Sequence, residues 1–202
     1  MIKLPYSYYQ SQDVNSLAID LLGKYLFTSI DGVVTGGFIV ETEAYKGVED
    51  KASHAFGGRF TNRTQTMYAE GGLSYVYLCY GIHHLFNVVT APKGIPHAVL
   101  IRGLEPVEGL DVMLARRGMA SLKPNLTAGP GALSKALGID KRLNASDLQG
   151  EEIWIEDRGM VYAQDDIVAA SRIGVAYADD HALLPWRYYV KGNRFVSKPN
   201  GR

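Results

Sequence analysis

Hydrophobic and polar residues alternate from Phe38 to Tyr45, in the stretch FIVETEAY, and this alternation predicts a β-strand. Successive side chains of a strand point to opposite faces, so Glu41, Glu43 and Tyr45 would share one face. Two carboxylates on one face suit a solvated sheet edge, which is the commoner arrangement for such a stretch taken alone. If the carboxylates are buried instead, each needs a partner, because removing a carboxylate from water is costly.

The residues that follow this strand favour the buried alternative. Glu49 and Asp50 precede the stretch Lys-Ala-Ser-His, and acidic residues at such a place are typical of the positive N-terminal end of a helix. We therefore predict a helix start here, with His54 about one turn inside it. A strand-end carboxylate, a tyrosine and a histidine would then converge across one short connection.

The remaining pattern predicts a mixture of helices and strands. Asp31-Gly32 is a strong tight-turn signal between two strands, and Gly23 suits the end of a preceding helix that Asp13 or Asn15 can cap. Helices are predicted over residues 13–23, 108–117 and 132–137, and strands over 25–30, 33–45, 97–102, 153–155 and 186–190. Residues 167–172 stay unassigned.

Residues 73–89 are rich in β-branched and aromatic side chains, with Tyr80-Gly81 at the middle. This composition predicts a pair of strands or one sharply bent strand. A tyrosine at such a bend can protrude, and an exposed aromatic at a hairpin tip is a candidate wedge between base pairs. The alternative, a tyrosine folded back onto the sheet, is the commoner arrangement in proteins generally.

The composition indicates one globular domain spanning residues 1–202, because a chain of this length with 47% hydrophobic residues can bury a full core. Cys79 is the only cysteine, which excludes a disulfide framework and a cysteine metal cluster. The first ten residues lack the apolar segment of a signal peptide, and no apolar run is long enough to cross a membrane. We therefore expect a soluble cytoplasmic protein.

The formal net charge is zero, but the charges are segregated along the chain. Residues 112–139 and 186–202 contain lysine and arginine without any acidic residue, whereas acidic residues gather at 147–166 and 179–180. Such blocks can form a face that binds a polyanion, or they can be ordinary solvated surface. The pattern leaves both alternatives open.

Several familiar catalytic motifs are absent from the sequence. His54 and the pair His83-His84 lack zinc-site spacing, and no P-loop, dinucleotide-binding glycine motif or Gly-x-Ser-x-Gly elbow occurs. No metal or other cofactor is therefore expected. Arg102 ends a short apolar strand, where it can be a salt-bridge partner or can steady a catalytic carboxylate or water. Gly129-Pro130-Gly131 opens a short helix whose N-terminus is either a plain turn or a phosphate site.

Taken together, these motifs resemble the alkyladenine (3-methyladenine) DNA glycosylase family. The matching stretches, from the first helix to near Tyr189, are Val-Glu-Thr-Glu43-Ala-Tyr45, Glu49-Asp50-x-Ala-Ser-His54, Gly-Gly-Arg59, Tyr75-Val-Tyr77-x-x-Tyr80-Gly81, Asn87, Leu-x-Arg102-x-Leu-Glu-Pro106, Gly129-Pro130, Leu-Ser-Lys135 and Arg172-Ile-Gly-Val175. The resemblance covers nearly the whole chain.

The resemblance implies a compact α/β mixed (α+β) domain with a curved antiparallel sheet, flanking helices and a protruding β-hairpin that enters the DNA minor groove. It implies a repair enzyme that flips alkylated purines out of duplex DNA and hydrolyses the N-glycosidic bond. 3-Methyladenine and 7-methylguanine are the expected substrates, with hypoxanthine and ethenoadenine as further candidates. Lyase activity is not expected, since no lysine falls among the matched site positions. We expect a monomer whose partner is damaged double-stranded DNA, located with the nucleoid if the source is bacterial.

The resemblance also implies roles for individual residues. Glu43 is similar to the general base that activates water, with Arg102 and the backbone carbonyl of Ile173 as the other groups that hold that water. Tyr45, His54 and Tyr77 correspond to walls of the base pocket, Asn87 to the residue that screens bases at its edge, and Tyr80 to the aromatic that fills the gap left by the flipped nucleotide. Arg59, Arg63 and Ile82 are expected to contact DNA.

The sequence departs from the family pattern at two places. Asn62-Arg63-Thr64 stands where members usually have Pro-Arg-Asn, and Ile82-His83 stands where methionine and an aromatic residue often follow the Tyr-Gly pair. These positions contact DNA or the lesion strand in members of the family, so the departures bear on which lesions are accepted and on the affinity for DNA. Two alternatives remain open: a damage sensor of the same fold without catalysis, and a small-molecule hydrolase or transferase that would have no use for an exposed Tyr80.

Overall fold

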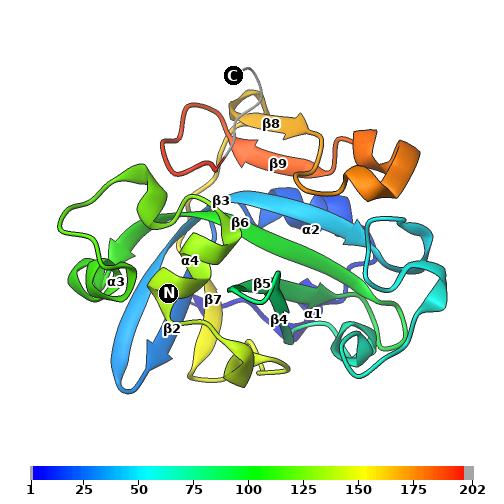
Figure 1. Ribbon diagram of the computed structural model, residues 1–202, viewed down its shortest axis with the longest axis horizontal. Helices are drawn as coiled ribbons and strands as arrows, with labels where there is room; N and C mark the ends of the chain where they lie inside the picture. The colour runs from blue at the N-terminus through cyan, green and yellow to red at the C-terminus, as the bar shows by residue number, and fades with distance from the viewer. Residues whose placement is uncertain (1, 198–202) are drawn as a thin grey trace.

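A single antiparallel sheet forms the framework of the protein. The computed structural model describes residues 2–197, and within them nine strands pair in the order β1-β7-β2-β3-β6-β5-β4, with β9 joining β3 and β8 joining β9 (Figure 1). The strands are β1 (Ile2–Lys3), β2 (Tyr25–Ile30), β3 (Val33–Lys46), β4 (Ser74–Cys79), β5 (His83–Thr90), β6 (His97–Glu108), β7 (Ile153–Asp157), β8 (Ile167–Ala170) and β9 (Arg187–Val190).

Strand β3 is the centre of this sheet. It pairs with β6 along one edge, while its other edge pairs first with β2 and then, from Glu41 onward, with β9. The register with β6 shifts on both sides of Glu41, so β-bulges interrupt the regular alternation there. Gly103 faces Glu41 across the bulge, and a Cβ at Gly103 would lie 2.8 Å from the Phe195 carbonyl oxygen. Only a residue without a side chain fits beside Glu41.

The α-helices that pack around the sheet in residues 2–197 are α1 (Tyr6–Tyr9), α2 (Val14–Asp20), α3 (Leu110–Arg117) and α4 (Pro130–Leu137). Asp13 caps α2 by accepting a hydrogen bond from the Ser16 amide, as predicted, and Leu17 and Leu21 are buried in the core. Helix α2 lies behind β3 in the view of Figure 1, and α4 lies in front. The predicted mixed α/β fold with a curved antiparallel sheet is confirmed.

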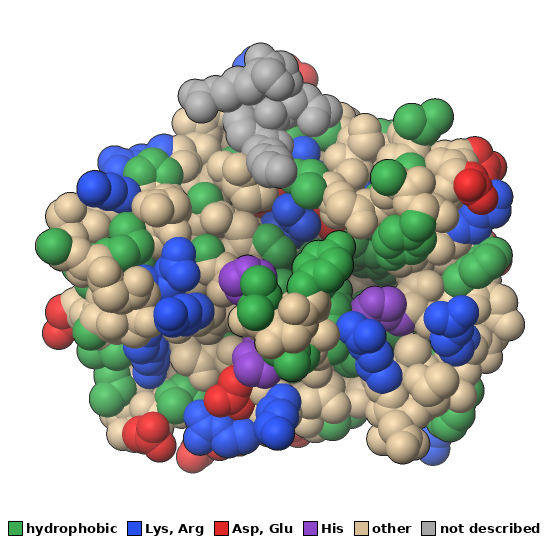
Figure 2. Space-filling view, in the orientation of Figure 1, with side chains coloured by type: hydrophobic (Ala, Val, Ile, Leu, Met, Phe, Trp, Pro, Cys, Tyr) green, Lys and Arg blue, Asp and Glu red, His purple; other side chains and the backbone are tan. Residues whose placement is uncertain are grey.

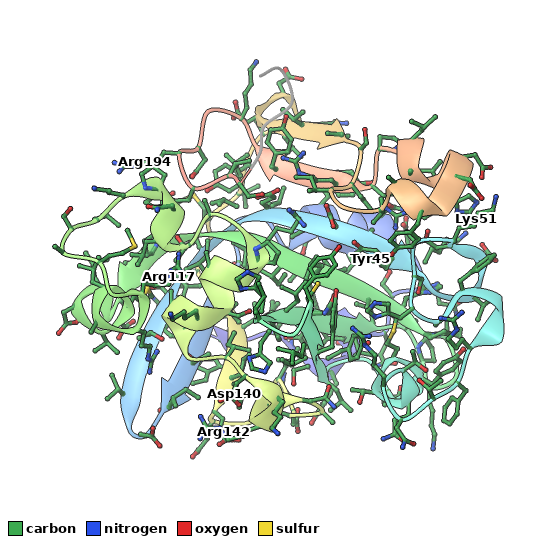
Figure 3. The ribbon with its side chains drawn as sticks, viewed as in Figure 1. Tyr45, Lys51, Arg117, Asp140, Arg142 and Arg194 are labelled. Carbon is green, nitrogen blue, oxygen red and sulfur yellow. The ribbon has the colours of Figure 1, made fainter. Side chains whose placement is uncertain are left out.

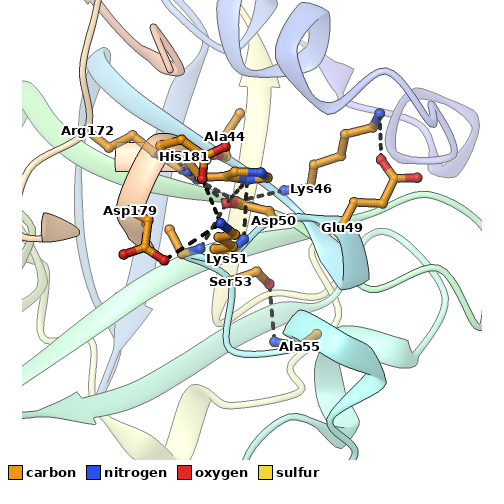
Figure 4. Close-up of polar contacts among 12 residues, drawn as sticks. Ala44, Lys46, Glu49, Asp50, Lys51, Ser53, Ala55, Arg172, Asp179 and His181 are labelled. Carbon is orange, nitrogen blue, oxygen red and sulfur yellow. Dashed lines mark hydrogen bonds and ion pairs between the residues drawn. The ribbon is translucent and has the colours of Figure 1, made fainter. Parts of the chain in front are cut away.

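The predicted helix start at residues 49–54 is wrong. A 3-10 turn over Gly47–Glu49 is followed by further turns instead. The reason is Asp50, which is fully buried: its carboxylate binds the Arg172 guanidinium and accepts hydrogen bonds from the Lys46 and Ala52 amides (Figure 4). A buried ion pair with a residue 122 positions away thus overrides the local helix signal.

Strands β4 and β5 form a hairpin with Tyr80 and Gly81 in its turn, so the strand-pair alternative is correct. Tyr80 has a φ of 50° and Gly81 a φ of 73°, a left-handed pair typical of tight hairpin turns. The Tyr80 side chain is 87% exposed and that of Ile82 is 71% exposed. The ring therefore protrudes instead of folding back onto the sheet.

The basic block at the end of the chain does not all reach the surface. Arg187 is buried on β9, Arg194 is exposed, and Lys198 and Arg202 lie outside the described residues. In Figure 2, lysine and arginine side chains occur on both sides of a central ridge of hydrophobic side chains over the β4–β5 hairpin. Among residues 2–197, no helix is long and apolar enough to span a membrane.

Candidate active site

Glu43 is the central polar residue of the site, and its side chain is completely buried. Its Oε1 accepts a hydrogen bond from the Ile173 amide at 2.7 Å and lies 3.3 Å from Nη1 of Arg102. Its Oε2 accepts a hydrogen bond from the Tyr45 hydroxyl at 2.8 Å. The solvated-edge alternative for Glu43 is thus wrong, because β6 and β9 cover both edges of β3 at this point.

A second buried carboxylate, Glu41, lies on the same side of β3 and shares Arg102 with Glu43. Arg102 Nε is 3.1 Å from Glu41 Oε1, and the Arg187 Nε is 2.8 Å from the same oxygen. Ser197 completes the set, with its amide 2.7 Å from Oε2. Among the described residues, two carboxylates and two guanidinium groups therefore form one buried cluster of opposite charges.

The surroundings of Glu43 make its carboxyl group a candidate base. Burial raises the pKa of Glu43 above its usual value, since a charged carboxylate loses its hydration there. The Arg102 charge and the hydrogen bonds from Ile173 and Tyr45 oppose this rise, and the nearby Glu41 charge adds to it. Balanced in this way, a carboxylate can accept a proton more readily than one in water.

A cavity of about 920 Å³ opens to the surface in front of Glu43. Glu43 itself does not line this cavity, but its three direct partners Tyr45, Arg102 and Ile173 do. The carboxylate thus lies one side chain behind the cavity wall. Figure 3 shows the Tyr45 side chain in the middle of the molecule, between the basic residues Arg117 and Lys51 on either side, which also line the cavity.

Aromatic rings form the wall on the opposite side. His54 packs edge-on against Tyr77 with ring centroids 4.7 Å apart, and its Nδ1 is 2.9 Å from the Tyr75 hydroxyl. Burial lowers the pKa of His54 to about 4, with the charges of Arg63 and Arg59 acting in the same direction. The imidazole is therefore neutral at physiological pH and presents an uncharged aromatic surface.

The structure brings the other predicted pocket residues to the same place. Asn87 lines a small adjoining cavity together with Tyr45, His54 and Tyr77, and its side-chain amide donates to the Tyr75 carbonyl at 3.0 Å. The contact made by Ile173 runs through its amide, which the sequence did not predict; the role expected for its carbonyl stays a prediction. The roles assigned to all these side chains likewise stay predictions.

The mouth of the cavity carries the predicted DNA-contacting residues. Tyr80 and Arg63 line it together with Arg59, and the Arg63 guanidinium stacks over the Tyr77 ring at 4.8 Å from the ring centre. Ile82 lies two residues beyond Tyr80 on the same exposed turn. Figure 2 shows a hollow beside the hydrophobic ridge, with basic side chains around it.

Sequence reasoning missed two supports of the site. Arg172 holds the Ala44 carbonyl and Asp50 and stacks over the Tyr45 ring, at 4.8 Å from its centre, so it fixes both Tyr45 and the neighbouring Ile173 (Figure 4). Tyr177 lines both cavities and donates its hydroxyl to the Ala52 carbonyl at 3.0 Å. Arg172 is part of the matched motif Arg172-Ile-Gly-Val175, so its place in the site could have been inferred from the sequence. Tyr177 lies outside the matched motifs, and nothing in the sequence indicated its place.

The described residues contain no group of three or more histidine, cysteine, aspartate or glutamate side chains that could hold a metal ion. What the site offers is a buried carboxylate, a guanidinium and an aromatic-lined cavity large enough for a purine. Such a set can stabilise a cation and activate water next to it.

Comparison with known proteins gives one consistent result. Residues 7–194 match the model of a family described as methylpurine-DNA glycosylase. Proteins named "Putative 3-methyladenine DNA glycosylase" are similar over nearly their whole length. One from Clostridium perfringens (strain 13 / Type A) is 45% identical, covering 94% of this chain and 97% of the relative. One from Bacillus cytotoxicus is 46% identical and one from Bacillus cereus (strain G9842) 44%, each covering 98% of this chain and 100% of the relative.

Proposed function

Because the chain belongs to the methylpurine-DNA glycosylase family, we propose that it removes alkylated purines, 3-methyladenine and 7-methylguanine, from duplex DNA by hydrolysing the N-glycosidic bond with water activated by Glu43. The observation that carries this proposal is the buried Glu43 carboxylate behind an aromatic-lined cavity whose mouth holds the exposed Tyr80. Binding of the flipped base, bond cleavage and DNA contact each have candidate residues in one place.

The lesion has to leave the helix before it can reach Glu43, because the bond to be cut is out of reach inside a duplex. Tyr80 is the side chain available to fill the vacated space, since it stands at the hairpin tip with 87% of its surface exposed. The flipped base enters between Tyr45 and the pair His54 and Tyr77. An alkylated purine is cationic, and electron-rich ring faces attract a cation, which favours damaged over normal bases.

Departure of the base leaves an oxocarbenium-like sugar, as in glycoside cleavage generally. The Glu43 carboxylate stabilises this positive charge and removes a proton from the attacking water. Glu43 Oε1 already accepts a hydrogen bond from the Ile173 amide and pairs with the Arg102 guanidinium, and Oε2 accepts a hydrogen bond from the Tyr45 hydroxyl. A water activated by Glu43 therefore has to replace the Tyr45 hydroxyl as the hydrogen-bond donor to Oε2. This requires the Tyr45 ring to shift slightly when the base stacks on it.

Release of free base from a panel of modified duplexes tests this function directly. Single 7-methylguanine, 3-methyladenine, hypoxanthine or ethenoadenine lesions are placed in otherwise identical duplexes and incubated with excess enzyme. We expect rapid release of the two cationic purines and slower release of the neutral lesions, because a neutral base leaves only after protonation. Binding of damaged duplex without release of any base would contradict the proposal and identify a non-catalytic damage-binding protein.

The rate of base release should fall in acid. Burial raises the pKa of Glu43, and the base form is the carboxylate, so activity is present above that raised pKa and is lost as the pH falls through it. 7-Methylguanine is the suitable substrate, because its positive charge does not change in the acid range, well below the pH at which its N1 proton dissociates. Single-turnover rates from about pH 4 to 6, corrected for spontaneous depurination, measure the effect. A rate that stays constant throughout would contradict Glu43 as the base.

A further inference from the structure

Glu41 has no role in the mechanism above, yet it is as deeply buried as Glu43. Like Glu43, it lies behind the cavity wall, but it binds neither Tyr45 nor Ile173; the wall residue that it contacts is Arg102. Its polar contacts within residues 2–197 are with hydrogen-bond donors: the Nε atoms of Arg102 and Arg187, and the amide and hydroxyl of Ser197. A carboxylate is the acceptor-only group that suits such surroundings. Burying it here costs free energy, which calls for a reason beyond filling space.

Within residues 2–197, Arg102 is the side chain that contacts both Glu41 and Glu43. Its Nε binds Glu41 Oε1 at 3.1 Å and its Nη1 binds Glu43 Oε1 at 3.3 Å, while Nη2 donates to the Ser197 hydroxyl at 3.3 Å. A guanidinium is planar, so a contact at Nε fixes the direction of the Nη atoms. Glu41 thus determines how closely the Arg102 cation approaches Glu43.

We propose that Glu41 is a positioning residue for base excision: it shares the Arg102 charge with Glu43, so that Arg102 only partly neutralises the Glu43 carboxylate, which stays basic enough to take a proton from water. The proposal rests on the proposed function of Glu43. It deepens that function by assigning the second carboxylate of the strand a part in the same reaction.

The charge balance supports this assignment. Among the described residues, the two carboxylates of the cluster oppose two guanidinium groups; loss of the Glu41 charge removes one negative charge beside a transition state that is itself cationic. Charged and titratable groups face Glu43 from several elements. Tyr45 and Glu41 lie on β3, and Arg102 lies on β6. Arg187 lies on β9, Arg172 follows β8, and Tyr177 lies in the 3-10 segment Ala176–Leu183. Of these, only Glu41 adds a second negative charge through a carboxylate.

Local backbone geometry is built to hold Glu41 where it is. The β-bulges on either side of Glu41 turn its side chain toward Arg102, and Gly103 leaves room because an added Cβ there would lie 3.0 Å from the Glu41 Cβ. Strand β9 supplies Arg187 directly opposite the site, in register with Glu43. Parts of the chain far apart in sequence therefore converge on this one carboxylate.

The test compares the pH dependence of 7-methylguanine release in wild type, Glu41→Gln and Glu156→Gln. Glu156 is a matched control, since it is a partly buried strand glutamate paired with Arg158 away from the cavity. In Glu41→Gln the like charge is gone and Arg102 is free to approach Glu43, and both changes favour the Glu43 carboxylate. We expect the acid limb of the pH–rate profile, where the rate falls with decreasing pH, to move to lower pH. The plateau rate at higher pH should fall about 10- to 100-fold, and Glu156→Gln should match wild type in both respects.

A merely structural role for Glu41 predicts lower thermal stability with an unchanged acid limb, and that result would overturn the proposal. If Glu41→Gln does not fold, Ser197→Ala provides the second test. It removes one donor from Glu41 and also the acceptor of Arg102 Nη2. Glu41 then binds Arg102 more strongly and draws it away from Glu43, so the acid limb should move to higher pH; no movement counts against the proposal. Glu43→Gln in the same assay separates the two hypotheses. Retained release by that variant refutes the proposed function, whereas an inactive Glu43→Gln with an unshifted Glu41→Gln refutes only the role of Glu41.

Discussion

Glu43→Gln should reduce the single-turnover rate of base release by about 10²- to 10⁴-fold, the usual contribution of a general base. The amide has the same shape as the carboxylate and can still accept the Ile173 hydrogen bond at Oε1. It has neither the negative charge that stabilises the sugar cation nor the basic oxygen that takes the proton from water. Radiolabelled 7-methylguanine release measures the rate, and fluorescence anisotropy with the same duplex measures binding, which we expect to change little.

Glu49→Gln is the appropriate control for this variant. Glu49 lies six residues further along, is exposed, and pairs with Lys46 on the surface. Its amide variant should release base at the wild-type rate. A Glu43→Gln enzyme that still releases base at a tenth of the wild-type rate or faster would show that another group activates the water.

Tyr80→Ala should slow base release from duplex DNA by about 5- to 150-fold, which corresponds to the roughly 1–3 kcal/mol of stacking that one aromatic ring contributes against a base. The ring stands in solvent, so the loss cannot come from the protein core, and the melting temperature should stay at its wild-type value. Without the ring, the gap left in the duplex stays open and the lesion returns to the stack.

Single-stranded DNA provides the discriminating measurement for Tyr80. A lesion in a single strand leaves no gap between paired bases, so Tyr80→Ala should release it almost as fast as wild type does, and Tyr80→Phe should behave as wild type on both substrates. Equal loss on single- and double-stranded DNA would mean that the ring acts elsewhere, in the pocket itself. No loss on either substrate would favour a small-molecule hydrolase or transferase that uses only the Glu43 cavity.

Elements whose signals lie within a few residues were predictable from the sequence. The cap at Asp13, the turn at Asp31-Gly32 and the strand predicted from the alternation at residues 38–45 each depend on neighbours in the chain, and the structure contains the cap, the turn and the strand. The protruding turn at Tyr80 was predictable as one of two alternatives, since a left-handed Tyr-Gly pair is a local property, while the direction of the ring is not.

The segment after β3 shows why other features could not be predicted. Glu49 and Asp50 carry the local signature of a helix start, but Asp50 is held inward by Arg172 and by two backbone amides, which leaves turns in place of a helix. A buried ion pair outweighs the few tenths to one kcal/mol that acidic residues contribute at a helix N-terminus. No residue near position 50 in the sequence indicates that Arg172 is the partner of Asp50.

The sequence by itself determined which strand carries Glu41, Glu43 and Tyr45, which turn carries Tyr80 and, through its motifs, the family to which these residues correspond. Only the tertiary structure decided that both glutamates are buried, that Arg102 and Arg187 bind them, and that the carboxylate lies behind a cavity wall instead of in it. The physical reason is that periodicity, caps and turns arise from neighbouring residues, whereas desolvation and charge pairing depend on strands β6 and β9, which reach β3 from distant parts of the chain.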